Sequence, residues 1–238
     1  MPLEAIIFDV DGTLAETEEL HRAAFNRAFA EHGLAWRWSS RRYATLLSTT
    51  GGRERIARHM AEIGLPLDPT LVTILHRAKN RIYAGLMGGG EVIPRPGVAD
   101  LIEEARRLSI RLAIATTTSR SNIAALLEHA FDADASNWFA VIVAGEDVTT
   151  KKPHPEVYRR ALAGLSLPAH ACIAIEDSRN GLQSALACGI PTVVTPSLYT
   201  RAEEFAGAAL LLGDLGTAPR VDIDALASLL PSALPAPP

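Results

Sequence analysis

Asp9 and Asp11 stand two positions apart in the segment Asp9-Val10-Asp11-Gly12-Thr13, at the end of a short apolar run. Strand geometry would turn both carboxylates to the same side, and Gly12 permits the turn that must follow. Two carboxylates at close range repel each other and gain from a bound cation. Because oxygen ligands favour hard cations, magnesium is the first candidate. An ordinary solvated turn at the end of a strand can have the same short sequence, so the two aspartates alone do not distinguish a magnesium site from such a turn.

Two further polar segments stand just before helical stretches. Thr116 opens the segment TTTS at 116–119, where hydroxyls and backbone N–H groups at a helix start suit a phosphate. Simple capping of the helix by Thr118 or Ser119 would use the same residue types. Lys152, in KKP at 151–153, is placed to neutralise phosphate charge, although a solvated loop lysine is the more common case. Both segments are candidates for an anion site.

Glu176 and Asp177 close another apolar run. Two adjacent acids at the end of a buried strand are costly unless they are paired or bind a metal. Together with Asp9 and Asp11, they indicate a cluster of carboxylates rather than an isolated pair.

The elements that would position these residues alternate along the chain. Strands are expected over 5–10, 112–116, 140–144, 172–176 and 192–195, and these runs are apolar almost throughout, as in a parallel sheet buried on both faces. Helices are expected over 98–109, 119–129, 155–165 and 181–188. Repeated strand–helix units predict a doubly wound α/β sheet of Rossmann-like form. Ligands bind beyond the carboxyl ends of such strands, which is where the polar segments stand.

Residues 15–89 interrupt this alternation. They are rich in Ala, Arg and Glu with helical periodicity, and predict a four-helix cap inserted into a core formed by 1–14 and 90–230. The inserted segment has 11 Lys and Arg against 7 Asp and Glu, a net charge of +4, whereas the remainder has −8. A solvated helical face is the ordinary explanation, and the imbalance gains meaning only for an anionic substrate. Residues 231–238 are expected to form a disordered tail.

Composition excludes several classes of protein. No apolar stretch approaches the ~20 residues that span a bilayer, and the N-terminal segment lacks the basic region of a signal peptide. Two cysteines are too few for a disulfide framework, which favours a cytoplasmic protein. A formal net charge of −4 gives no indication of binding to nucleic acid or to an anionic membrane.

The sequence resembles the haloacid dehalogenase superfamily of phosphatases. The resemblance rests on four motifs in order: DVDGT at 9–13, Thr116, Lys152 in KKPHPEVY, and IEDSRNG at 175–181. The inserted helices are similar to the cap of the β-phosphoglucomutase-like subgroup. Within it, AETEELHRAAFNRAF at 15–29, STTGGRERI at 48–56, HRAK at 76–79 and IATTTS at 114–119 are most similar to phosphatases of Calvin-cycle operons. Those enzymes hydrolyse xylulose 1,5-bisphosphate, an inhibitor of Rubisco.

The resemblance implies roles for the core residues. Asp9 would be the nucleophile that forms an aspartyl phosphate, and Asp11 the acid and base, with its pKa raised by the nearby phosphate. Magnesium would bind Asp9, the main-chain oxygen of Asp11 and Asp177, with Glu176 as a ligand or as a partner behind the ligands. Thr116 and Lys152 would hold the phosphoryl oxygens.

It also implies a substrate site shared by the cap and the start of a core helix. Arg53, with His21 and Lys79, is expected to meet the second phosphate of a bisphosphate. The full set implied to bind substrate is Asp11, Glu18, His21, Gly51, Gly52, Arg53, His76, Lys79, Thr116, Thr117, Thr118, Ser119 and Asn122. The expected partner is a small sugar phosphate or bisphosphate, and the protein is expected to be a monomer.

Three alternatives stay open at this point. A β-phosphoglucomutase uses the same acids to move phosphate, but this chain has Thr49 where the mutase has a cap lysine. A dehalogenase lacks the second acid that Asp11 supplies. A catalytically silent binding module on the same fold would turn over no phosphoester.

Overall fold

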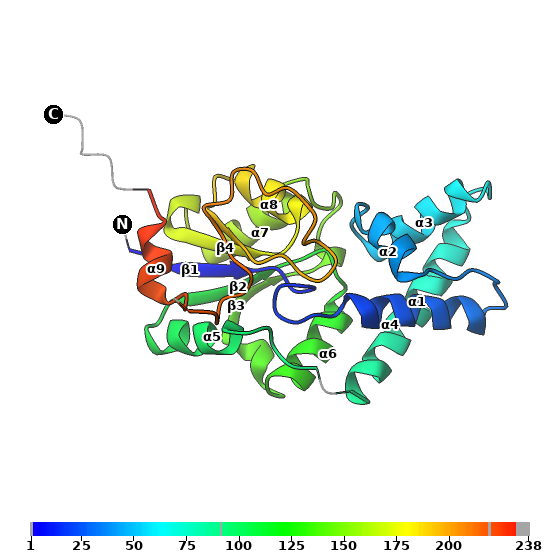
Figure 1. The fold of residues 1–238 in the computed structure, drawn as a ribbon, viewed down its shortest axis with the longest axis horizontal. Helices are drawn as coiled ribbons and strands as arrows, with labels where there is room; N and C mark the ends of the chain where they lie inside the picture. The colour runs from blue at the N-terminus through cyan, green and yellow to red at the C-terminus, as the bar shows by residue number, and fades with distance from the viewer. Residues whose placement is uncertain (1, 91, 219, 232–238) are drawn as a thin grey trace.

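The structure is a computed structural model that describes residues 2–90, 92–218 and 220–231. Within these residues, parallel strands form one sheet in the order β3-β2-β1-β4-β5-β6 (Figure 1). The strands are β1 (Ala5–Phe8), β2 (Arg111–Ala115), β3 (Phe139–Val143), β4 (Cys172–Glu176), β5 (Thr192–Val194) and β6 (Leu210–Leu211). The predicted doubly wound α/β fold is confirmed.

Alternate residues of the central strand face opposite helical layers. Ile6 and Phe8 belong to the cluster that contains residues of α5 (Val98–Arg107), α6 (Arg120–Ala130) and α9 (Ile223–Ser228). Ala5 and Ile7 pack with α7 (Glu156–Leu165) and α8 (Arg179–Leu186), which lie on the other side of the sheet in Figure 1. Because both faces are covered, the strands show the continuous apolar runs seen in the sequence.

Four helices stand between β1 and α5 in the chain: α1 (Glu18–Glu31), α2 (Ser40–Leu47), α3 (Gly52–Glu62) and α4 (Pro69–Gly88). We call residues 18–88 the cap. It has an aromatic core of its own, in which Phe25, Phe29, Trp38 and Tyr43 are fully buried. Figure 1 shows α1 and its neighbours beyond the end of the sheet at which β1 leaves it, so the cap faces the carboxyl ends of the strands.

The long helix α4 belongs to both parts of the molecule. Its first half contributes Val72 and Leu75 to the aromatic core of the cap. Its last turns contribute Tyr83 and Met87 to the large cluster under the sheet, where α4 packs against α6. The limits drawn from the sequence, 15–89 for the cap and 1–14 with 90–230 for the core, remain a prediction.

The strand that precedes the first motif is shorter than expected. β1 ends at Phe8, and the chain then turns, with Leu14 N–H donating to Val10 O at 2.9 Å and Gly12 N–H donating to Ala15 O at 2.9 Å. Gly12 has a φ of +81°, a conformation that favours glycine. Asp9 and Asp11 therefore do not share one face of a strand, contrary to the expectation for residues 5–10.

The remaining elements are short. β6 and α9 were not predicted from the sequence, and three 3₁₀ turns cover Ala135–Trp138, Gly145–Asp147 and Ala169–Ala171. Of the tail expected at 231–238, only Pro231 lies among the described residues. None of the helices in the described part of the chain combines the length and the apolarity needed to cross a membrane.

Candidate active site

Lys152 lies between two carboxylates at the carboxyl ends of β1 and β4. Its Nζ donates to Oδ1 of Asp9 at 2.6 Å and to Oε1 of Glu176 at 2.7 Å. Tyr158, from α7, donates its hydroxyl to the same Glu176 oxygen at 2.6 Å. Glu176 is 0% exposed, so these two donors supply the partners that a buried carboxylate requires. Glu176 thereby fixes the lysine against Asp9.

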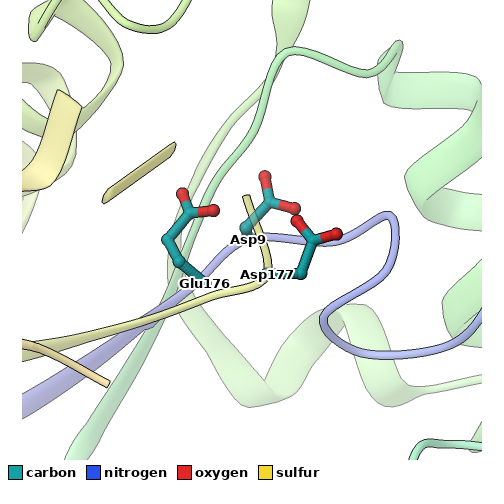
Figure 2. Close-up of side chains that lie close together, drawn as sticks. All are labelled: Asp9, Glu176 and Asp177. Atoms are coloured by element: carbon teal, nitrogen blue, oxygen red, sulfur yellow. The ribbon is translucent and has the colours of Figure 1, made fainter. Parts of the chain in front are cut away.

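Asp9, Glu176 and Asp177 each offer a carboxylate oxygen, and these oxygens lie within 4.8 Å of one another (Figure 2). Burial, opposed by Lys152 and reinforced by Glu176, raises the pKa of Asp9 to about 7. Burial and the charges of Asp9 and Glu176 also raise the pKa of Asp177 well above its usual range. One lysine does not balance this much buried negative charge, and a cation would.

The donor atoms of this cluster are suitable for binding a hard divalent cation. All three donors are carboxylate oxygens, the ligand type that magnesium prefers. Oε2 of Glu176 is buried with no hydrogen-bond partner among the described residues. Gly12 leaves the space that Asp177 occupies, since a Cβ at Gly12 would overlap Oδ2 of Asp177. The residues therefore fit the metal that the resemblance implies.

Asp11 faces the cap rather than Lys152. Its Oδ1 accepts a hydrogen bond from Thr17 Oγ1 at 2.6 Å and lies 2.8 Å from Nε2 of His21, both at the start of α1. Burial raises the pKa of Asp11, but the charge and hydrogen bond of His21, followed by Thr17 and Lys79, lower it below its usual range. With these partners Asp11 is an ionised carboxylate, whereas the raised pKa expected from the sequence refers to Asp11 beside a phosphate.

The segment 116–119 lines one side of the cavity. Oγ1 of Thr116 accepts the N–H of Thr118 at 3.3 Å, which holds the segment in a turn. Ser119 does not cap α6 with its side chain; its Oγ accepts Nδ2 of Asn80, from cap helix α4, at 2.9 Å. Asn122 donates to Thr118 Oγ1 at 3.1 Å, and its Oδ1 is buried with no hydrogen-bond partner among the described residues.

Most of the residues predicted to bind substrate line one cavity between the cap and the sheet. Its lining includes Asp9, Asp11, Glu18, His21, Gly51, Gly52, His76, Lys79, Thr116, Thr117, Thr118, Ser119, Asn122, Lys152 and Asp177. Two predicted residues are not part of this lining. Glu176 contacts Lys152 without lining the cavity, and Arg53 is exposed and lines an adjoining groove that shares Gly51, Gly52 and His76 with the cavity.

Arg55, which the sequence analysis did not select, lines the cavity instead of Arg53. Its guanidinium lies over the ring of Tyr43 at 5.1 Å and donates to the Tyr43 hydroxyl at 2.8 Å. Arg55 is only 8% exposed, and within the described part of the chain its Nε has no hydrogen-bond partner. Among the described residues no ion pair joins Arg55 to a carboxylate. The Tyr43 hydroxyl in turn donates to Oε2 of Glu18 at 2.7 Å, so Glu18 is linked to Arg55 through the tyrosine rather than by an ion pair. A buried guanidinium in this position favours an anionic ligand.

Lys79 and His76 line the same side of the cavity, from α4. Burial lowers the pKa of Lys79 to about 7, with Asp11 opposing and Arg55 reinforcing the shift. Burial also lowers the pKa of His76 to about 3, helped by the charges of Lys79 and Arg53. The ring of His76 fits against Gly52, where a Cβ would lie 2.7 Å from Cδ2 of the histidine. A pKa of about 3 leaves His76 a neutral imidazole near neutral pH, so the positive charge at this end of the cavity comes from Arg55 and from the protonated form of Lys79.

The cap contacts the core on three sides of the cavity. Thr50 donates to the carbonyl of Lys152, Asn80 donates to Ser119, and Asn180 donates to the carbonyl of Ser48 at 3.3 Å. Lys152 therefore meets cap residues through its backbone and Asp9 through its side chain.

Comparisons with known proteins identify the family of the chain. A family model described as haloacid dehalogenase-like hydrolase matches residues 3–189. The CbbY protein of Rhodobacter capsulatus is 52% identical over 92% of this chain and 96% of its own length. A crystal structure of a CbbY mutant from Rhodobacter sphaeroides, in complex with xylulose 1,5-bisphosphate, has a TM-score of 0.88 and 50% identity, covering 90% of this chain and 96% of that one. A β-phosphoglucomutase from Clostridium difficile shares the fold, with a TM-score of 0.76 at 20% identity over 91% of this chain and 93% of that one.

Proposed function

The chain belongs to the haloacid dehalogenase-like hydrolases and is a phosphatase of that family, and on this premise we propose that it is a magnesium-dependent sugar-bisphosphate phosphatase. The proposed reaction converts xylulose 1,5-bisphosphate to xylulose 5-phosphate through an aspartyl phosphate on Asp9. The observation behind this assignment is the division of one cavity into two ends, one with the carboxylate cluster and Lys152 and the other with the buried cationic residues Arg55 and Lys79.

The first end is the reacting one. Lys152 and the hydroxyl of Thr116 face the position next to Asp9 where a phosphoryl group would be held. Asp9, Asp177 and the main-chain oxygen of Asp11 would hold Mg²⁺, with Oε2 of Glu176 as a further free oxygen. When bound, the ion would neutralise charge on the transferring phosphoryl group.

The second end is formed by the cap. Arg55 and Lys79 are both buried, both cationic in type and both without an ion-pair partner among the described residues. A monophosphate bound near Asp9 would make no contact with these two residues, which have Asp11 and Glu18 as neighbouring acids. A bisphosphate would supply the second anion, and the net charge of +4 over residues 15–89 favours the same class of substrate.

The residues give a consistent order of steps. A carboxylate oxygen of Asp9 attacks phosphorus, the bond to the sugar oxygen breaks, and Asp11 donates a proton to that oxygen. Asp11 then accepts a proton from the water that attacks the aspartyl phosphate, releasing inorganic phosphate and restoring Asp9. Because Asp11 is ionised in the free protein, it must take up a proton as substrate binds, and the approaching phosphate raises its pKa in the required direction.

The similarity to CbbY favours the particular sugar. A relative of 50% identity has been crystallised with xylulose 1,5-bisphosphate, and the match covers nine-tenths of this chain. Cytoplasmic location, a monomeric state and the absence of nucleic-acid or membrane partners remain predictions from the sequence.

The test is the release of inorganic phosphate from a panel with magnesium present: xylulose 1,5-bisphosphate, xylulose 5-phosphate, β-glucose 1-phosphate and an aryl phosphate. We expect the highest kcat/KM for the bisphosphate, with one phosphate released per molecule. A higher kcat/KM for β-glucose 1-phosphate or xylulose 5-phosphate would contradict the bisphosphate assignment.

The same panel separates the alternatives. A mutase would convert β-glucose 1-phosphate to glucose 6-phosphate without net release of phosphate when primed with glucose 1,6-bisphosphate. Thr49, at the position of the mutase lysine, does not line the cavity and accepts a hydrogen bond from Arg58 instead. A silent binding module would release phosphate from none of the four compounds.

A further inference from the structure

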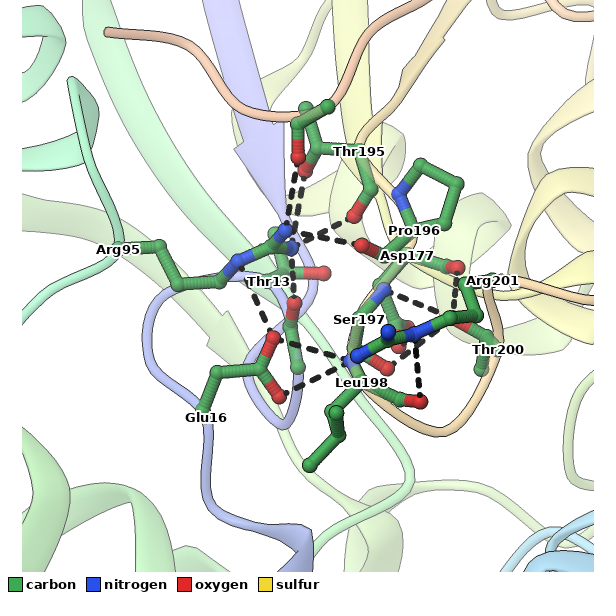
Figure 3. Close-up of polar contacts among 12 residues, drawn as sticks. Thr13, Glu16, Arg95, Asp177, Thr195, Pro196, Ser197, Leu198, Thr200 and Arg201 are labelled. Carbon is green, nitrogen blue, oxygen red and sulfur yellow. Dashed lines mark hydrogen bonds and ion pairs between the residues drawn. The ribbon is translucent and has the colours of Figure 1, made fainter.

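Arg95 is a buried arginine on the segment that returns from the cap to α5. It is 9% exposed, and its guanidinium points into a ring of main-chain oxygens (Figure 3). Nη1 donates to the carbonyls of Gly12 and of Thr195, the latter at 2.6 Å, and Nη2 donates to those of Pro196 at 2.9 Å and Gly213 at 3.1 Å. One side chain thus joins the turn after β1, the loop after β5 and the residues after β6.

The charge of Arg95 is poorly compensated. Its ion-pair partner among the described residues is Glu16, at 3.5 Å from Nε, and the Glu16 side chain is 43% exposed. A buried charge of this kind adds little stability and is often replaceable by apolar packing. The planar guanidinium does, however, fix several acceptors in one geometry, which an apolar side chain cannot do. The arrangement is therefore better suited to positioning than to stability.

The loop that Arg95 holds also holds Asp177. After Thr195 and Pro196, the N–H of Ser197 donates to Oγ1 of Thr200 at 2.8 Å. The Thr200 hydroxyl donates to the main-chain oxygen of Asp177 at 2.7 Å and lies 3.3 Å from its Oδ2. Figure 3 shows this path from Arg95 through the loop to Asp177.

Glu16, on the connection that leads from β1 to the cap, also binds the loop that follows β5. Its carboxylate accepts the N–H of Leu198 at 3.1 and 3.3 Å while it faces Nε of Arg95. Glu16 precedes α1 and Arg95 follows α4, so the two residues stand on the two connections between cap and core. Both connections are fastened to the loop that supports Asp177.

We propose that Arg95 is a positioning residue for the metal end of the site: by holding Gly12 and the loop 195–200, it sets the place of Asp177 and hence the affinity for Mg²⁺. This inference rests on the proposed function for the identity of the ion. It does not require Arg95 to touch the ion or the substrate.

The test is the affinity of the metal-free full-length protein for Mg²⁺ alone, measured by isothermal titration calorimetry. For Arg95→Gln we expect the Kd to rise about 10- to 100-fold, the range found when partners behind metal ligands are removed. Arg95→Lys should recover part of the affinity, because one ammonium can reach some of the carbonyls but not all. At saturating magnesium, phosphatase activity of Arg95→Lys should return towards that of the parent.

Arg111→Gln is the matched control. Arg111 also donates to a carbonyl, that of Leu165 at 2.7 Å, and pairs with Glu4, but it stands at the opposite end of β2 from the cavity. It should lower the melting temperature without changing the Kd for Mg²⁺.

An unchanged Kd in Arg95→Gln, within about twofold of the parent, together with a lower melting temperature would overturn the proposal, because Arg95 would then be structural only. Should Arg95→Gln not fold, Arg95→Lys decides: a Kd raised about threefold or more supports the proposal, and an unchanged Kd overturns it. A parent protein that binds no Mg²⁺ would contradict the proposed function itself, whereas a parent that binds while all variants bind equally well contradicts only the role of Arg95.

Discussion

Nζ of Lys152 lies 2.6 Å from Oδ1 of Asp9, so the ammonium contacts one oxygen of the carboxylate that is proposed to attack phosphorus. Among the described residues, the hydrogen bond to the other oxygen, Oδ2, is a long one from the hydroxyl of Thr13, at 3.5 Å. Lys152 thus holds one side of the nucleophile and leaves the second oxygen turned towards a substrate or an ion. The pair also explains why the pKa of Lys152 is raised, since Asp9 and Glu176 outweigh the effect of burial.

Asp9→Asn is expected to abolish turnover, because an amide oxygen cannot form the acyl phosphate. The fold should persist, since the amide still accepts a hydrogen bond from Lys152 and the ammonium keeps Glu176. The measurement is phosphate release from xylulose 1,5-bisphosphate, with the melting temperature as the check on folding. Turnover within about tenfold of the parent, a difference of only about 1.4 kcal/mol in the barrier, would rule out the covalent route.

Removing magnesium is expected to stop hydrolysis, and adding it back should restore the activity. Asp177→Ala should raise the magnesium concentration needed for half-maximal activity steeply, because it removes a carboxylate from the proposed site. Ser178→Ala, at the start of α8, is a neighbouring control that leaves the carboxylates in place. Full activity after treatment with EDTA would show that the assignment of a metal is wrong.

Arg55→Ala is expected to lower kcat/KM for xylulose 1,5-bisphosphate about 10- to 100-fold, the value of one charge-assisted hydrogen bond of about 1.5–3 kcal/mol. The loss for an aryl phosphate should be much smaller, because that substrate has no second phosphate. Arg53→Ala is the matched control, two residues away on the exposed side of the same helix.

Comparing Arg53→Ala with Arg55→Ala shows which arginine contacts the second phosphate: Arg53, as expected from the sequence, or Arg55, as the structure suggests. A larger change of substrate preference in Arg53→Ala than in Arg55→Ala would restore Arg53 as the residue that meets the distal phosphate. Equal losses for both substrates in Arg55→Ala would mean that Arg55 supports the cap and does not recognise the second phosphate.

The pKa of Lys79, lowered to about 7, predicts a dependence on pH. A lowered lysine pKa means that the ammonium is present below about pH 7 and is lost as the pH rises through that value. Between about pH 7 and about pH 9, kcat/KM for the bisphosphate should therefore fall by about tenfold relative to Lys79→Arg, which stays charged. The ratio of the two proteins cancels the titration of the substrate, and a ratio that is constant across this range would contradict the role of Lys79.

The sequence was sufficient to predict the strands that form long apolar runs. The strands β1 to β5 are continuous apolar runs, and each candidate residue of the core follows one of them, so the sheet itself predicts that they meet. β6 is only two residues long and α9 only six, lengths at which periodicity cannot be distinguished from chance. Thr17 and Thr200 were missed because a threonine is common in loops, and Thr17 was passed over although it lies in the quoted segment 15–29.

The helical spacing of residues in α3 could have identified Arg55 from the sequence, although the short motif did not. α3 buries Arg55, Ile56, His59 and Met60, a spacing of one face of a helix, and Arg53 lies outside that face. An arginine on the same helix face as a buried isoleucine and a buried methionine is unusual unless it binds another group. The glycines before Arg53 instead favoured the choice of Arg53, which is exposed. The phase of the helix, rather than the short motif, would have selected the residue that lines the cavity.

The double membership of α4 has a consequence for protein engineering. Tyr83 and Met87 pack with the core under the sheet although they end a cap helix, and the ring of Tyr83 stacks on His21 at 4.1 Å between centroids. A chimera that exchanged residues 15–89 for the cap of another enzyme would remove both side chains from the core and leave a cavity there, at a cost of several kcal/mol for two large residues. A transplant that keeps the last two turns of α4 from the host would retain that packing, so the specificity of the cap is better exchanged at a junction inside the helix than at the glycines that follow it.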